Sequence, residues 1–136
     1  MPDVYAKENL FKIEGAWVFG DDAKLSPTAI AANVDDYDPT GWRDTGVVQV
    51  TGLLLDSNGN NDFTGLAAPS PAVSNMVYIF NTGVTGGAIT LVANSGNSVA
   101  ANRFDMNGNT TLQPGEGLWV VYNTSTNRWN EIARAI

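Results

Sequence analysis

The sequence predicts an all-β fold, an antiparallel β-sandwich or jelly-roll-like module with an N-terminal arm. Short apolar runs rich in β-branched and aromatic residues recur along the chain, as in strands. Clusters of glycine and asparagine separate these runs and supply turn chemistry. In the C-terminal half the turn signals are regularly spaced, which is typical of sandwiches. The length of 136 residues fits one domain.

The first expected strand covers residues 10–19. Phe11, Ile13, Trp17 and Phe19 would lie on one face of it, because alternate side chains of a strand point to the same side. Exposed aromatic side chains anchor many protein interfaces. Phe11, Trp17 and Phe19 are therefore candidates for contact with a partner, which this segment could bind by adding a strand to a neighbouring sheet.

The sequence changes character near Asp44, where an irregular stretch gives way to a regular alternation of strands and turns. We therefore expect residues 1–45 to form an arm and residues 46–136 to form the core of a single domain. Trp42 falls in the expected arm, after an acidic loop. It is a further interface candidate, since tryptophan can contact a protein or stack on a sugar ring.

In the expected core, apolar runs predict several strands. These runs cover residues 47–55, 76–80, 89–92, 118–122 and 128–136. The pair Asn58-Gly59 favours a hairpin turn, and the glycine-rich stretch 83–87 favours another turn, because it has neither the lysine nor the following helix of a phosphate-binding loop. Trp119 and Trp129 are expected in the core.

Composition argues against several classes of function. The chain contains no histidine and no cysteine, so catalytic triads based on imidazole, thiolate metal sites and disulfides are excluded. Its net charge of -7 would repel nucleic acid and anionic membranes. The N-terminal residues lack the charge and apolar run of a signal peptide. We expect no nucleic-acid partner and no membrane partner.

Two acidic clusters are candidate sites. Within Asp35-Asp36-Tyr37-Asp38, Asp36 and Asp38 could share a face, as a glycosidase pair would require, but turn formation by aspartate explains the same residues better. Residues 56–67 begin like an EF-hand calcium loop, yet Asn61 and Ala67 stand where that loop requires glycine and glutamate. We expect no enzyme, no catalytic residue, no metal ligand and no cofactor, although a calcium site of another type stays open.

Six motifs in order resemble a domain of tailed-phage virion proteins. They are DDYDPTGW (residues 35–42), FTGLAAP (63–69), VYIFNTG (77–83), ITLVANSGNSVAANRF (89–104), LQPGEGLWVVY (112–122) and NRW (127–129). The sequence resembles the β-sandwich structural or decoration domains of such particles, found in head decoration proteins and in modules associated with tail or head fibres.

The resemblance implies a non-enzymatic building block, with a trimer favoured. It implies a virion location after assembly in the host cytoplasm. The first hypothesis is a capsid decoration (cement) or head-associated protein that binds the major capsid protein, or other virion proteins, as a homo-oligomer. The alternative is a receptor- or glycan-binding module of a tail or head fibre, with a host-surface glycan as its ligand.

Overall fold

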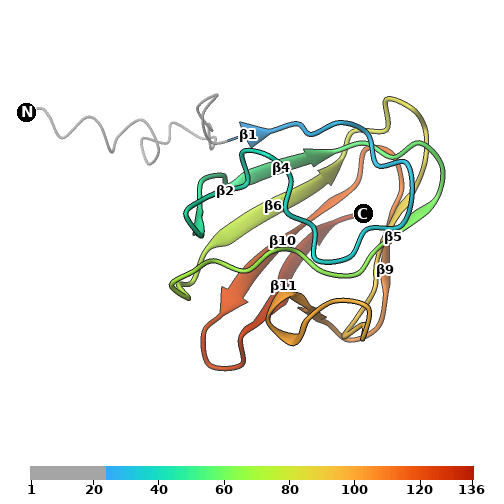
Figure 1. Cartoon of the computed structure of the whole chain (residues 1–136). Coiled ribbons are helices and arrows are strands. Elements are labelled where there is room, and N and C mark those ends of the chain that lie inside the picture. Colours follow the sequence, from blue (N-terminus) through green and yellow to red (C-terminus); the bar gives the residue numbers. More distant parts are fainter. Residues whose placement is uncertain (1–23) are drawn as a thin grey trace, which may run out of the picture.

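The computed structural model describes residues 24–136, which form an all-β structure in mixed sheets (Figure 1). The predicted fold class is confirmed to this extent. Within the described part of the chain, helical structure is limited to the 3-10 turn η2 (Ala100–Asn102). The strand expected over residues 10–19, with Phe11, Trp17 and Phe19, lies outside the described residues.

The largest sheet has six strands in the order β1-β4-β6-β10-β11-β8. These strands are β1 (Lys24–Leu25), β4 (Gly52–Leu55), β6 (Met76–Asn81), β10 (Gly117–Asn123), β11 (Arg128–Ala135) and β8 (Phe104–Asp105). In Figure 1 the strands from β1 to β11 lie side by side in this order. The strands expected near residues 76–80, 118–122 and 128–136 are thereby confirmed.

Two smaller sheets complete the fold. One has the order β5-β7-β9, formed by β5 (Asn61–Phe63), β7 (Ile89–Leu91) and β9 (Thr110–Leu112). The other pairs β2 (Arg43–Asp44) with β3 (Val47–Val48). The single run expected over residues 47–55 is therefore divided between β3 and β4, which belong to different sheets.

The sheets are mixed, so the antiparallel expectation is wrong for part of the fold. The pairs β1–β4, β4–β6, β5–β7 and β11–β8 are parallel. Three successive segments of the chain, residues 24–37, 52–66 and 76–92, run side by side in the same direction. Parallel neighbours need a crossover between them. Alternating hydrophobicity fixes which face of a strand is buried, but not the direction of the next strand.

The crossovers explain a second difference from expectation. Asn58-Gly59 does form a sharp bend, with Gly59 at a φ of 106°. The bend leads from β4 in the six-stranded sheet to β5 in the three-stranded sheet, so it does not close a hairpin. The stretch 83–87 likewise leads from β6 to β7 in the other sheet.

Residues 24–45 belong to the domain, which corrects the expected arm boundary at residue 45. Ile30, Val34 and Tyr37 each bridge in parallel to the chain segment 57–66. Their backbone N–H groups donate to the carbonyls of residues 56, 62 and 65 over 2.8–2.9 Å. Ile30 is also part of the buried core. Isolated bridges, rather than long strands, join these residues to the sheet. Because such bridges need no long apolar run, the sequence did not indicate that residues 24–45 belong to the domain.

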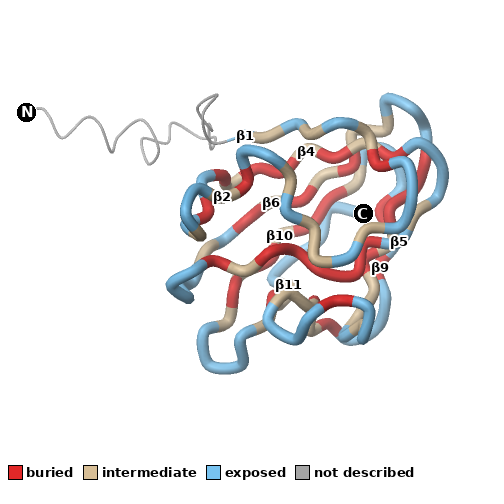
Figure 2. The backbone as a smooth tube through the Cα atoms, in the orientation of Figure 1, coloured by how far each residue is buried: buried red, intermediate tan, exposed pale blue. Residues whose placement is uncertain are grey.

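Buried side chains from both larger sheets form one hydrophobic cluster. It includes Leu53, Ile79, Val120 and Trp129 from the six-stranded sheet and Phe63, Ile89, Leu91 and Leu112 from the three-stranded sheet, all with no exposed surface. Figure 2 shows the buried positions along the central strands and the exposed positions in the connecting loops. The core therefore occupies one face of the six-stranded sheet and includes buried side chains of the three-stranded sheet.

Candidate functional site

The opposite face of the six-stranded sheet is also apolar. Strand register places Lys24, Gly52, Tyr78, Trp119 and Ala133 in one row across five strands. Side chains that pair directly across neighbouring strands point to the same side of a sheet. Leu54, Phe80, Gly117 and Ala135 form the next row, and Met76, Val121 and Asn130 form a third. These three rows, which lie wholly within residues 24–136, contain no acidic residue.

We call this surface the outer face and define it by seven side chains. They are Leu54, Met76, Tyr78, Phe80, Trp119, Val121 and Ala133. None of them belongs to the buried core, and each is partly or largely exposed, with Met76 half exposed at 50%. A contiguous apolar surface of this kind on a sheet typically marks a contact with another protein segment.

The aromatic side chains of the outer face pack on one another. The ring centroids of Tyr78 and Trp119 lie 5.2 Å apart, and those of Tyr78 and Phe80 lie 5.9 Å apart with nearly parallel planes. Tyr78 also lies over Gly117, since a Cβ atom at residue 117 would approach the Tyr78 hydroxyl oxygen to 2.6 Å. The aromatic rings of the outer face are thus held in a defined arrangement by their neighbours.

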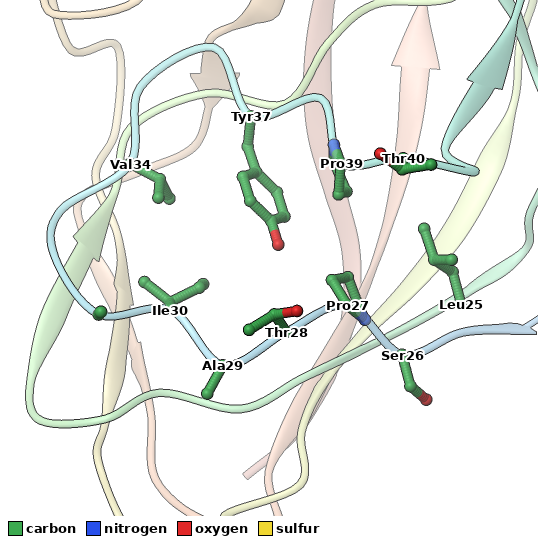
Figure 3. Close-up of a pocket in the computed structure, with 11 residues that line it drawn as sticks. Leu25, Ser26, Pro27, Thr28, Ala29, Ile30, Val34, Tyr37, Pro39 and Thr40 are labelled. Atoms are coloured by element: carbon green, nitrogen blue, oxygen red, sulfur yellow. The ribbon is translucent and has the colours of Figure 1, made fainter.

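A groove opens beside the edge strand β1, between residues 25–31 and residues 34–40 (Figure 3). Its volume is about 520 Å³. Leu25, Pro27, Ile30, Val34 and Pro39 provide apolar walls, and Ser26, Thr28 and Thr40 add hydroxyl groups. No carboxylate lines it. The groove suits an apolar or neutral group better than a charged one.

Tyr37 projects into this groove, with its hydroxyl directed toward the segment that carries Pro27 and Thr28 (Figure 3). Its ring packs edge-on against Phe63, with the centroids 5.4 Å apart. Burial raises the pKa of the Tyr37 hydroxyl above its usual value, because the tyrosinate anion would lose hydration there. Tyr37 therefore presents a neutral hydroxyl at physiological pH.

Trp42 is not part of any exposed surface, which corrects its prediction as an interface residue. Its side chain has no exposed area, and its indole Nε1–H donates to the carbonyl of Ala67 over 2.8 Å. The Trp42 ring lies 6.1 Å from that of Trp129. Trp42 follows a polar loop in the sequence, and this setting gives no indication that the segment of residues 24–45 contributes side chains to the core.

Trp119, which was expected in the core with Trp129, differs from expectation in the other direction. It lies on the outer face, whereas Trp129 lies in the core as expected. In β10, Leu118, Val120 and Tyr122 point into the core while Trp119 and Val121 point away from it. Because apolar residues occupy both faces, the alternation that normally distinguishes them is absent from the sequence. β10 pairs antiparallel with both β6 and β11, and only its register with these strands separates the outer face from the core.

The aspartates of residues 35–38 have separate partners. The Asp35 carboxylate accepts a hydrogen bond from the Thr64 hydroxyl over 2.5 Å. Asp38 forms an exposed ion pair with Arg43, with a shortest N–O distance of 2.6 Å. The arrangement offers no shared carboxylate pair of the kind that glycosidases use.

Asp36 holds the loop of residues 98–102 against the segment of residues 33–38. Its Oδ1 accepts hydrogen bonds from the backbone N–H of Val99 and the side-chain amide of Asn102, both over 2.8 Å. Its own N–H donates to the Ser98 hydroxyl over 2.9 Å. Asp36 also adopts a φ of 48°, which aspartate tolerates better than most residues. Its role is structural.

Other motif residues also stabilise the fold. The Asn81 side-chain amide is buried and donates to the carbonyls of Gly87 and Leu112, each over 2.9 Å. Arg103 donates through Nε to the carbonyl of Ser98 over 2.8 Å. The Trp129 indole donates to the carbonyl of Leu66 over 2.8 Å. These contacts explain why such residues occur at these positions without assigning them a ligand.

The acidic and amide side chains near residues 56–62 bind the protein's own backbone. Asp56 accepts from the N–H of Thr85 and Asn60 accepts from the N–H of Ala88, each over 3.0 Å. Within residues 24–136, no group of three or more acidic side chains is arranged to hold a metal ion.

No family model, curated protein or solved structure matches this chain. In the described part of the chain, no helix is long and apolar enough to cross a membrane.

Proposed function

We propose that this chain is a non-enzymatic structural protein of a tailed-phage particle. Its role would be that of a capsid decoration or head-associated protein, which binds the capsid lattice as a homo-oligomer, with a trimer favoured. The six ordered motifs support the virion assignment through their resemblance. The observation that carries the proposal is the outer face, because it is an apolar surface suited to contact with a further protein segment.

The shared core supports a two-layer β-sandwich as the architecture of this building block. The six-stranded and three-stranded sheets supply buried side chains to one cluster, as the two layers of a sandwich do. A rigid scaffold of this kind suits a protein displayed in many copies on a lattice. The net charge of -7 would also help a crowded particle to remain dispersed.

The proposal of a non-enzymatic role has support of two kinds. The sequence contains neither histidine nor cysteine, which removes the usual general base and thiol nucleophile. The carboxylates of Asp35, Asp36 and Asp38 are each engaged by a different group.

Receptor or glycan binding is the second candidate, and the groove beside β1 is the feature that favours it. Tyr37 offers an aromatic ring, and Ser26, Thr28 and Thr40 offer hydroxyl groups for a neutral sugar. The groove replaces Trp42 as the place where a host-surface glycan would bind. It ranks second because the outer face spans more strands and gathers more aromatic side chains.

The test is binding of the full chain to purified capsids that lack decoration proteins. The proposal predicts co-sedimentation that saturates at a fixed number of chains per capsid and a rise in the temperature at which the capsid opens. A glycan array run on the same protein tests the second candidate. Failure to bind any capsid or virion, together with selective binding of one sugar class on the array, would reverse the ranking.

A further inference from the structure

The N-terminal end of the described chain lies at the edge of the outer face. Lys24 in β1 pairs with Gly52 in β4, in the row that continues through Tyr78 and Trp119. Leu25 packs toward the core, so the alternate residue Lys24 lies on the outer side of the sheet. The residues that precede Lys24 therefore start beside the apolar surface.

Chain length allows these residues to cross the surface. Phe19 lies five residue steps before Lys24, and an extended chain spans at most about 3.5 Å per step, or roughly 17 Å in all. Neighbouring strands lie about 4.8 Å apart, so β10 is roughly 14 Å from β1. Phe19 can thus reach the middle of the outer face, and Trp17 can reach beyond it.

The composition of residues 10–19 matches the surface. Phe11, Ile13, Trp17 and Phe19 occur at odd positions, so an extended segment would present all of them on one side. Lys12 and Glu14 would face the other way, and their charges cancel. The three rows of the outer face hold no acidic residue that would repel the segment.

We propose that the outer face is the binding site for residues 10–19 of the same chain. Attachment through only a few residues gives the segment an effective local concentration of the order of millimolar, which favours its own chain over a second copy. The aromatic side chains of the segment would cover Tyr78, Phe80 and Val121, and its polar side would face a virion partner. The role of the docked segment in contacting a virion partner rests on the proposed function, whereas the docking itself does not.

The absence of cysteine allows a direct cross-linking test in the full chain. Trp17→Cys is combined with Val121→Cys on the outer face, or with Val84→Cys as the matched control, since Val84 is 82% exposed on the loop after β6. A short bis-maleimide should join residues 17 and 121 within one chain, with a yield at least roughly tenfold above that of the control pair. Peptide mass spectrometry identifies the linked residues.

A second measurement does not depend on the exact register. With Val121→Cys as the sole thiol, the double change Trp17→Lys and Phe19→Lys should raise its rate of maleimide labelling severalfold, while the labelling of Val84→Cys stays constant. Equal yields for both cysteine pairs, or cross-links only between two chains, would overturn docking within one chain. Unchanged labelling of Val121→Cys would also overturn it.

The two proposals fail in distinguishable ways. If residues 17 and 121 cross-link within one chain but no capsid binds, the docking stands and the proposed function falls. If capsids bind but the cross-linking yield equals that of the control, the function stands and the docking falls.

Discussion

The two faces of the six-stranded sheet are both apolar, yet they differ in burial. On the inner face, Leu53, Ile79, Val120 and Trp129 have no exposed surface and share one cluster with the three-stranded sheet. On the outer face, the apolar side chains remain partly exposed although a solvated sheet face usually carries polar residues. The stability of the fold explains why the inner face is apolar, but it does not explain why the outer face is apolar. The proposed contact of the outer face with a further protein segment would explain why this face is apolar.

The largest effect on stability should come from truncating the inner face at Trp129. Trp129→Ala removes a fully buried ring and its hydrogen bond to Leu66, and such changes cost about 3–5 kcal/mol of unfolding free energy. Ile132→Ala in the same strand is the control, because Ile132 is 50% exposed and should cost far less. Denaturant unfolding measures both. Equal losses of unfolding free energy in the two variants would contradict the placement of Trp129 in the core and of Ile132 at the surface.

An intermediate effect is expected where the outer face is itself tightly packed. Gly117→Ala would place a Cβ atom 2.6 Å from the Tyr78 hydroxyl oxygen and 2.7 Å from the carbonyl oxygen of Ile79. The sheet must adjust, and overpacking of this kind costs about 1–3 kcal/mol. Gly96→Ala, with open space around residue 96, should leave the unfolding temperature nearly unchanged. A Gly117→Ala variant as stable as the Gly96→Ala variant would show that Tyr78 does not lie over residue 117.

A smaller effect concerns the alkaline limit of stability. Burial raises the pKa of Tyr122 on the inner face, and Arg128 partly opposes this shift. A tyrosine with a raised pKa in the folded state contributes stability that is fully present below its unfolded pKa of 10.0 and is lost as the pH rises through the folded value. Stability should therefore decline above about pH 10. Thermal unfolding against pH should show a shallower decline for Tyr122→Phe, and identical declines would contradict this role of Tyr122.

The sequence predicts the elements that depend on local patterns. Residues 76–80 and 128–136 form strands as expected, because β-branched and aromatic runs between turn residues specify them locally. Strand direction was not predicted, since the parallel pairing of β1, β4 and β6 depends on crossovers that alternation does not encode. The buried position of Trp42 was missed for a similar reason, because isolated bridges bring residues 30–37 into the domain.

For the candidate site, the outer face shows the same limit of prediction from local sequence patterns. Leu118, Trp119, Val120 and Val121 form one continuous apolar run, which predicts a buried strand and gives no sign that its two faces have different surroundings. Only the register with β6 and β11 separates Trp119 and Val121 from the core residues. The candidates Phe11, Trp17 and Phe19 stay predictions, since they lie outside the described residues.

The most direct test of the account is a single charge placed on the outer face. Val121→Lys should leave the unfolding temperature close to that of Val84→Lys, because the side chain of residue 121 is outside the core. It should nevertheless weaken co-sedimentation with undecorated capsids by roughly tenfold or more, which corresponds to a loss of at least about 1.4 kcal/mol of binding free energy. Capsid affinity equal to that of Val84→Lys would contradict the central claim that the outer face exists for binding.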